Sequence, residues 1–435
     1  MATRMPPGKR SRPWADLPTE LVDAVVAHLD VFSAARLAAV RAPWARTVAT
    51  AKPSLPFGRP CLLASHEFHD SDGEDNDDYT FDALDLGAAD GEAAPRAPAV
   101  IEAFRDRFWV GGRGAWLAAV DEDCNAQLLN LYTGDHVGLP AVSTIPGVEP
   151  SGYRCKVRHV TRQDTYTYTF RKIVVCDTPS APSGAGAYLA VTIVTSLILA
   201  VARGGDRSWT ALKNHRDLMA GYDDAVVHKG RVFVVDVAGR VFAWDLLRAA
   251  CSNPDPERVP AAPGATSYGE SVYQWNLAES ADGRRLILAC THGRYARHEK
   301  RGRNDSTKTV HRFRGDGVRL HELDVDDAAG GDGRRWRRVT SLGDRALFLG
   351  ANWPLWATVS RGPPGQVAQP NCVYVAPAAL FGYPDKDFDV VAYDLGDGSC
   401  RQIKVSAADR DEDDDGFVIP IWFTPTLQMR SQRAS

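Results

Sequence analysis

The chain has 435 residues, of which 44% are hydrophobic and 24% are charged, the usual balance for a globular protein with a packed core. That composition excludes a chain that is disordered throughout, collagen-like or a coiled coil, and the length allows up to three domains. The formal net charge of −4 gives no overall attraction to nucleic acid or to an anionic membrane, so we expect neither as a partner.

The first 12 residues are basic and rich in proline, which predicts a disordered N-terminus. No apolar leader is visible there, and the eight scattered cysteines include no Cys-x-x-Cys pair that would suit a structural zinc site. We therefore expect a protein of the cytoplasm and/or nucleus, without a metal or cofactor.

Residues 13–57 have a helical pattern. Leu17, Leu21, Val25 and Leu29 recur every fourth residue with Val22 beside them, which predicts one apolar stripe along a helix. Asp16 is the expected N-cap, with Pro18 in the first turn. A second helix is predicted after Ser33, with Leu37, Val40 and Trp44 on one face and Pro43 as an interruption or kink. So short a unit has little core of its own.

From residue 58 to residue 428 the pattern changes to short strands separated by Gly, Asp and Pro turns. The expected strands lie at residues 108–110, 116–120, 127–131, 172–176, 231–235, 241–244, 285–289, 371–375 and 390–393. The apolar run at 187–202 is too short for a bilayer, which needs about 20 residues, and is predicted to form two buried strands joined by a turn. Imperfect repetition of hairpins over this length favours a mainly β fold, a β-propeller of six or seven blades.

Three charged segments interrupt the strands: an acidic one at residues 67–92, a basic one at 294–314 and an acidic one at 409–415. Blocks of like charge are typical of solvated loops, and we expect loops here, although the basic block is also suited to an acidic partner. Residues 411–416 resemble the start of an EF-hand loop. Ile419 and Trp422 occupy the later ligand positions, so no calcium site is predicted. Residues 429–435 are expected to be a tail.

Five tryptophans begin or end a predicted strand, and we expect them to anchor the cores of the blades. They are Trp116, Trp209, Trp244, Trp336 and Trp422. No catalytic motif is present: the sequence lacks a nucleophile elbow, a phosphate loop, a dinucleotide fingerprint and a His-Glu-x-x-His helix.

The helical segment resembles an F-box, the module by which ubiquitin-ligase receptors bind a Skp-type adaptor. The resemblance rests on Trp14-Ala15-Asp16-Leu17-Pro18-Thr19-Glu20-Leu21-Val22, followed by Val25, Leu29, Leu37, Val40 and Trp44. It implies that the adaptor contacts Leu17, Pro18, Leu21, Val22, Val25, Leu29, Leu37, Val40 and Trp44. Pro43 departs from the family pattern in a way that could disturb the last helix and weaken docking.

The remainder resembles the plant KIB-type β-propeller that commonly follows such an F-box. The matching stretches are residues 60–63, 114–117, 128–134, 139–140, 208–210, 224–233, 341–350, 371–374 and 422–425. Trp353 and Trp356 replace the smaller polar residues expected from this resemblance. Because exposed tryptophans are favoured interface anchors, both are candidate substrate contacts.

Together the two resemblances imply a non-catalytic, substrate-recognition subunit of a Skp/cullin/F-box ubiquitin ligase. Its partners would be the adaptor, through it a cullin ligase, and an unknown protein substrate. Two alternatives stay open. One is a propeller scaffold for protein binding without coupling to a ligase, for which Pro43 is the motivating residue. The other is a propeller enzyme, such as a hydrolase or oxidase, for which no convergent cluster of carboxylates or metal ligands is visible in the sequence.

Overall fold

A computed structural model describes most of the chain, which divides into two compact units: residues 1–58 with 425–435, and residues 59–424. The described residues are 17–29, 31–51, 58, 60–66, 80–85, 108–121, 123, 125–132, 134–151, 154–158, 165–168, 170–176, 188–194, 197–215, 221–245, 255–263, 272–301, 307–326, 335–359, 368–376, 390–403 and 421–425. The predictions for residues 1–12, 409–415 and 429–435 lie outside them. No helix among the described residues is long and apolar enough to cross a membrane.

The first unit holds three helices: α1 (Thr19–Val26), α2 (Val31–Val40) and α3 (Ala42–Ala51). Their buried faces form a small core of Val22, Val26, Ala34, Ala38, Trp44, Ala45 and Val48. Pro18 is the N-cap of α1 and accepts hydrogen bonds from the backbone N–H groups of Leu21 and Val22 through its carbonyl oxygen. The helix therefore begins one residue after the proline, and the expectation that Asp16 is the N-cap with Pro18 in the first turn is wrong.

The second predicted helix is in fact two helices. The first ends at Val40 and the next begins at Ala42, so the prediction that Leu37, Val40 and Trp44 share one face is wrong. Pro43 lies in the first turn of α3, where a residue has no intrahelical partner for its N–H group. The proline therefore separates two helices and leaves the ten-residue α3 intact.

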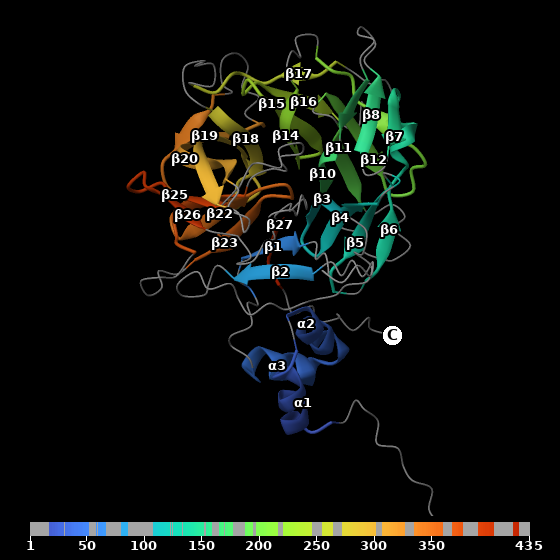
Figure 1. Cartoon of the computed structure of the whole chain (residues 1–435), viewed down its shortest axis with the longest axis vertical. Coiled ribbons are helices and arrows are strands. Elements are labelled where there is room, and N and C mark those ends of the chain that lie inside the picture. The colour runs from blue at the N-terminus through green and yellow to red at the C-terminus, as the bar shows by residue number, and fades with distance from the viewer. Residues whose placement is uncertain are drawn as a thin grey trace, which may run out of the picture. The chain divides into compact units, whose positions relative to one another are not determined.

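The second unit is a β-propeller, and its described residues form six blades around a common centre (Figure 1). The first three blades contain, in order, β3 (Phe108–Arg113), β4 (Trp116–Val120), β5 (Ala126–Asn130) and β6 (His136–Gly138); β10 (Phe170–Cys176), β11 (Leu189–Val194), β12 (Ile198–Arg203) and β13 (Thr210–Ala211); and β14 (Tyr222–His228), β15 (Arg231–Asp236), β16 (Val241–Asp245) and β17 (Glu257–Arg258).

The fourth blade contains β18 (Val272–Glu279), β19 (Leu286–Arg301), β20 (Thr307–Leu323) and β21 (Arg337–Val339). The fifth contains β22 (Arg345–Leu349), β23 (Leu355–Thr358), β24 (Cys372–Val375), β25 (Val390–Asp394) and β26 (Cys400–Ile403). The sixth joins β1 (Cys61–His66) and β2 (Thr80–Asp85) to β27 (Ile421–Phe423). A separate small sheet, β7 (Val148–Ser151), β8 (Arg154–Arg158) and β9 (Thr165–Tyr168), follows the short 3-10 helix at Val142–Thr144.

The sixth blade closes the ring with strands from both ends of the unit. The antiparallel pairs Cys61↔Phe423, Leu62↔Trp422 and Leu63↔Ile421 join β1 to β27. At another point the first and second blades touch through a single parallel pair, Gly111↔Ile173. A Cβ atom at Gly111 would lie 2.0 Å from the Ile173 carbonyl oxygen, so this approach of two inner strands requires glycine.

All nine strands expected from the sequence are found, and the run at 187–202 forms β11 and β12 as predicted. The loop prediction is wrong for part of each of two charged segments. Residues 80–85 of the acidic segment form β2, and the described part of the basic segment continues β19 and β20. Pairing along the strands satisfies their backbone groups whatever the charge of the side chains. A block of like charge therefore did not indicate a loop at these positions.

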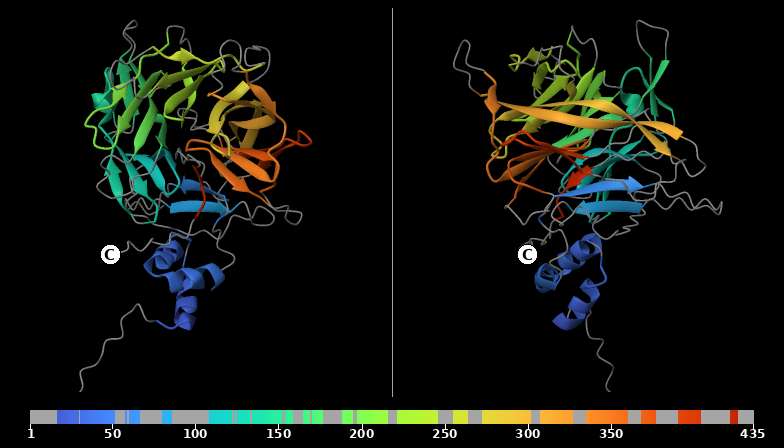
Figure 2. Two further views of the ribbon diagram at one scale, coloured as in Figure 1. Left: turned by 180° about the vertical axis from the view of Figure 1, so that it is seen from behind. Right: turned by 60° about the vertical axis from the view of Figure 1, so that its left-hand side comes forward.

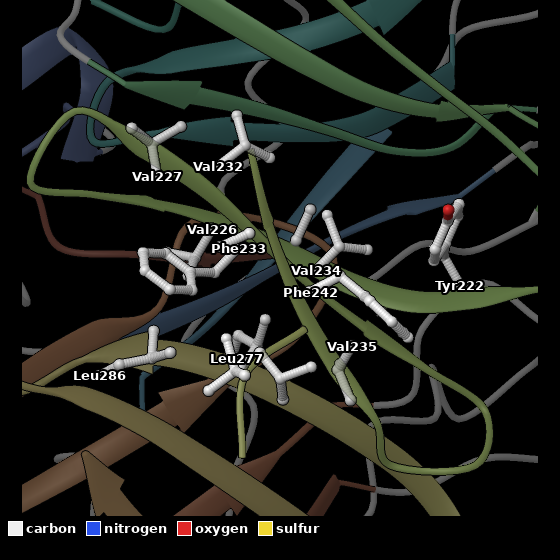
Figure 3. Close-up of a cluster of buried hydrophobic side chains, with 14 of the residues drawn as sticks. Tyr222, Val226, Val227, Val232, Phe233, Val234, Val235, Phe242, Leu277 and Leu286 are labelled. Atoms are coloured by element: carbon white, nitrogen blue, oxygen red, sulfur yellow. The ribbon is translucent and has the colours of Figure 1, made fainter. Parts of the chain in front are cut away.

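The blades pack through large apolar side chains. Figure 3 shows part of one cluster, in which residues of β14, β15 and β16 lie beside Leu277 of β18 and Leu286 of β19. Within β15, every residue from Val232 to Asp236 is buried. Such runs without alternation are typical of strands covered on both faces, which is the position of a blade between two neighbours.

Tryptophan side chains also join neighbouring blades by hydrogen bonds. The indole N–H of Trp209 in the second blade donates to the carbonyl of Pro140, which follows the first blade, at 2.7 Å. Trp336 in the fourth blade donates in the same way to Pro260 after the third, also at 2.7 Å. All five predicted anchor tryptophans, Trp116, Trp209, Trp244, Trp336 and Trp422, are buried, which confirms their expected place in the core.

We expect Trp209→Phe to reduce the free energy of unfolding by about 1–3 kcal/mol more than Trp275→Phe, because it leaves a buried carbonyl without its donor. Both rings are 3% exposed, but the indole nitrogen of Trp275 has no hydrogen-bond partner in the structure. Denaturant unfolding of the two variants measures the difference. Equal losses would mean that the hydrogen bond to Pro140 contributes nothing beyond ring packing.

Candidate functional site

The described helical unit exposes three large apolar side chains. Leu21, Val25 and Val40 are 52%, 45% and 59% exposed. Leu21 and Val25 are four residues apart on α1, so they lie on the same face of that helix. An exposed apolar pair on a unit with so small a core is suited to contact with another protein.

The other residues predicted to contact an adaptor divide between the surface and the core of the same unit. Pro18 is exposed. Leu17, Leu29 and Leu37 are half-buried against the helical core, whereas Val22 and Trp44 are buried in it. The structure thus brings the nine residues into one small unit without placing all of them at its surface.

The two tryptophans considered as substrate contacts are held by the propeller itself. Trp353 is only 9% exposed, its backbone N–H donates to Gly112, and the guanidinium of Arg113 lies 4.2 Å from the ring centroid. Trp356 is half-buried on β23 and its indole donates to the carbonyl of Glu279 at 2.8 Å. The expectation that both tryptophans are exposed is therefore wrong, because contacts with other blades cover them; Trp353 nevertheless lies outside the strands, in the bend between β22 and β23.

The inner strands of the propeller meet at a buried ion pair that sequence reasoning missed. The ammonium of Lys172 on β10 lies 2.5 Å from a carboxylate oxygen of Asp224 on β14, and both side chains are about 95% or more buried. The same ammonium donates to the carbonyl of Gly350 at 3.2 Å. One salt bridge therefore joins residues of the second, third and fifth blades.

The Asp224 carboxylate is further satisfied by its own strand and by the next blade. It accepts hydrogen bonds from the backbone N–H groups of Ala225 and Leu277, at 2.7 and 2.9 Å, and from the Asn276 side chain at 3.3 Å. The carbonyl oxygen of the Asn276 side chain is buried without a partner. The sequence offered only a weak signal, since Arg171 and Lys172 both precede the apolar residues Ile173 to Cys176 and nothing indicates which of the two is buried.

A cleft of about 590 Å³ lies between the fourth and fifth blades. Its lining includes both basic and acidic side chains, among them Arg319, Arg338, Asp316 and Asp394. Tyr393 also lines it, with a buried hydroxyl that has no hydrogen-bond partner. Burial, and then the nearby Cys400 and Asp316, raise the pKa of that hydroxyl. The cleft thus offers charges of both signs to a polar ligand.

The arginines of the cleft also act on His321. Burial lowers the pKa of this histidine, and the positive charges of Arg338 and Arg319 lower it further. Its Nδ1 atom is buried without a partner. The charges of these two arginines therefore disfavour the protonated form of His321. Among the described residues, no group of three or more His, Cys, Asp or Glu side chains is arranged to hold a metal ion.

A family model described as the KIB1-4 β-propeller matches residues 89–394, whereas no curated protein matches the chain. Among solved structures, the N-terminal domain of Nup159 is 11% identical, with 72% of this chain and 67% of that chain covered and a TM-score of 0.29. The Cps50 (Swd1) β-propeller domain of Myceliophteria thermophila is 9% identical, with 71% and 88% covered and a TM-score of 0.31. At such low scores these two structures carry no information about binding by this chain.

We expect Lys172→Met to reduce the free energy of unfolding by about 3–5 kcal/mol, because it leaves the Asp224 carboxylate buried without its counterion. The matched control is Lys213→Met, which removes an ion pair with Asp255 whose side chains are 53% and 58% exposed. That change should cost about 0–1 kcal/mol. Denaturant unfolding distinguishes the two, and similar losses would contradict the role assigned to the buried pair.

The lowered pKa of His321 predicts a pH dependence of stability. Since the unfolded chain binds the proton first, at a pKa of about 6.5, the free energy of unfolding should fall as the pH falls below that value. In His321→Gln this loss should be smaller over the same pH range. Unfolding measured at a series of pH values tests this, and parallel curves for the two proteins would contradict it.

Proposed function

The chain belongs to the KIB1-4 β-propeller family, and we propose that it is a substrate-recognition subunit of a Skp/cullin/F-box ubiquitin ligase. The three helices act as an F-box that binds a Skp-type adaptor, and the propeller captures a protein substrate. The observation that carries this proposal is the exposed pair Leu21 and Val25 on α1, within a sequence that resembles an F-box.

In this function the chain positions the substrate and takes no part in the chemical reaction. Its adaptor links it to the cullin ligase, whose recruited machinery transfers ubiquitin, so no side chain of the receptor enters the reaction. Binding a substrate beside the charged ubiquitin carrier raises the effective concentration of the accepting lysine. We accordingly propose a non-catalytic receptor that acts in the cytoplasm and/or nucleus.

The division of the predicted contact residues supports a specific form of adaptor binding. Leu21, Val25 and Pro18 are exposed and would contact the adaptor directly. Val22 and Trp44 are buried in the helical core, and they would act by holding α1 against α3. Pro43 lies in the first turn of α3, so α3 remains available to support α1.

We expect the double substitution Leu21→Asp and Val25→Asp to abolish co-purification with a Skp-type adaptor, because it places two carboxylates where an apolar contact must lose its water. The control is Val237→Asp, a change to an apolar residue that is 38% exposed in the propeller. This variant should retain the adaptor. Thermal unfolding of all proteins checks that the propeller is intact, and full retention by the double variant would contradict the proposal.

The second candidate is a protein-binding scaffold without a ligase. The two functions separate in affinity purification under proteasome inhibition, performed with the whole chain and with a chain that lacks residues 13–57. A substrate of the ligase is recovered by both chains but accumulates in cells only with the shortened one. Proteins that are recovered without any change in their lifetime would favour the scaffold.

A further inference from the structure

The longest hairpin of the propeller extends beyond its own blade. β19 and β20 contain 16 and 17 residues and pair with each other from Leu286↔Leu323 to Arg301↔Thr307. The neighbouring strands pair only with the base of this hairpin: β18 pairs with it up to His292, and β21 with Leu320, His321 and Glu322. Among the described residues, 293–301 and 307–315 therefore form a two-stranded ribbon, visible as the long yellow to orange strands in the right-hand view of Figure 2.

One face of this ribbon has only positive charge. Residues that are paired directly, and every second residue along each strand, share a face. The register therefore places Arg294, Ala296, His298 and Lys300 on the same face as their partners Arg314, Arg312, Val310 and Lys308. We call these eight positions the basic face. They include five Lys or Arg residues and no Asp or Glu, whereas the only acidic residue of the paired ribbon, Glu299, is on the opposite face.

The basic face places like charges directly opposite each other. Arg294 pairs with Arg314, and Lys300 pairs with Lys308. Both arginines are exposed. Like charges at directly opposed positions destabilise a strand pair, and a ribbon of two strands is marginal in water by itself. Repulsion between these paired charges therefore destabilises the ribbon, and an anionic partner bound to the basic face would offset that repulsion.

The geometry points to an acidic, extended segment of a partner protein, and we propose that the basic face binds such a segment. Successive residues of one face are about 7 Å apart along a strand, which is also the spacing of alternate side chains in an extended peptide. Over the seven residues from Arg294 to Lys300, which are six residue steps, the face is about 20 Å long. A peptide with acidic residues at alternate positions would meet cations along this whole length.

A protein segment fits better than a nucleic acid. The basic face contains no Phe, Tyr or Trp on which a base could stack, and His298 is its only residue with an aromatic ring. The chain as a whole is acidic, with a formal charge of −4, so a long polyanion would be repelled beyond the ribbon whereas a short acidic segment would not. At the base of the ribbon, Gly293 precedes Arg294 and lines the cleft that also contains Arg319 and Arg338. The basic face thus adjoins a cleft of mixed charge, lined by Asp316 and Asp394 as well as by the two arginines.

This inference rests on the proposed function only in treating the captured protein as a substrate; binding itself needs no adaptor. The test uses the purified full chain and a fluorescent peptide of alternating Glu and Thr, with fluorescence anisotropy as the measurement. Arg294→Gln with Arg314→Gln should weaken binding by about tenfold or more, since two of the five Lys and Arg charges of the basic face are removed. The matched control is Arg297→Gln with Arg301→Gln, which removes two charges from the opposite face of the same ribbon and should change affinity by less than about threefold.

Each other outcome overturns the proposal. Equal losses in the two double variants would mean that general charge, not the basic face, attracts the peptide. An oligonucleotide of equal charge that binds more tightly than the peptide would identify a nucleic-acid surface. Binding that appears only after the acids of residues 67–79 are changed to amides would assign the face to the acidic segment of the chain itself.

Thermal unfolding completes the test: removing the Arg294–Arg314 repulsion should not lower the melting temperature, so lost binding cannot be attributed to lost folding. Adaptor co-purification is measured separately, so failure of this proposal leaves the ligase proposal standing.

Discussion

Closure of the ring is the constraint on which the propeller depends. Cys61–Leu63 and Ile421–Phe423 are separated by almost the whole second unit, and yet they pair within one blade. A blade is covered on both faces only when its two neighbours are present, so an open ring would expose apolar surface at both ends. Trp422 stabilises the junction from within, because its buried ring packs edge-to-face on Phe348 and its indole donates to the Leu349 carbonyl.

Two kinds of polar contact hold the closed ring in register. Near the outer strands, tryptophan N–H groups donate across blade boundaries to backbone carbonyls such as Pro140 and Pro260. At the inner strands, Lys172 and Asp224 satisfy each other and the backbone of neighbouring blades. Because buried polar groups tolerate few geometries, these contacts favour one arrangement of the blades.

The binding surfaces proposed for this chain are opposite in chemistry. On α1 the exposed residues Leu21 and Val25 are apolar, and their burial by a partner is driven by the hydrophobic effect. On the ribbon of β19 and β20 the exposed Arg294 and Arg314 are cationic, and they favour acidic partners in a way that depends on salt. A receptor that must hold an adaptor and a substrate at once gains from this difference, since neither partner suits the other's surface.

The sequence by itself determined nine of the strands, the strand pair at 187–202, the blade-core tryptophans and the helical unit, because local periodicity and turn residues decide these features. It predicted Trp353 as an exposed residue, whereas only packing between blades decides its burial. It predicted a loop at residues 294–314, because the block of positive charge can be read from the sequence, whereas the pairing register of β19 and β20 cannot. The contact between Lys172 and Asp224 joins residues 52 positions apart, and no local pattern specifies which buried charges will meet. Those features depend on how distant strands are arranged around the ring, which the tertiary structure alone decided.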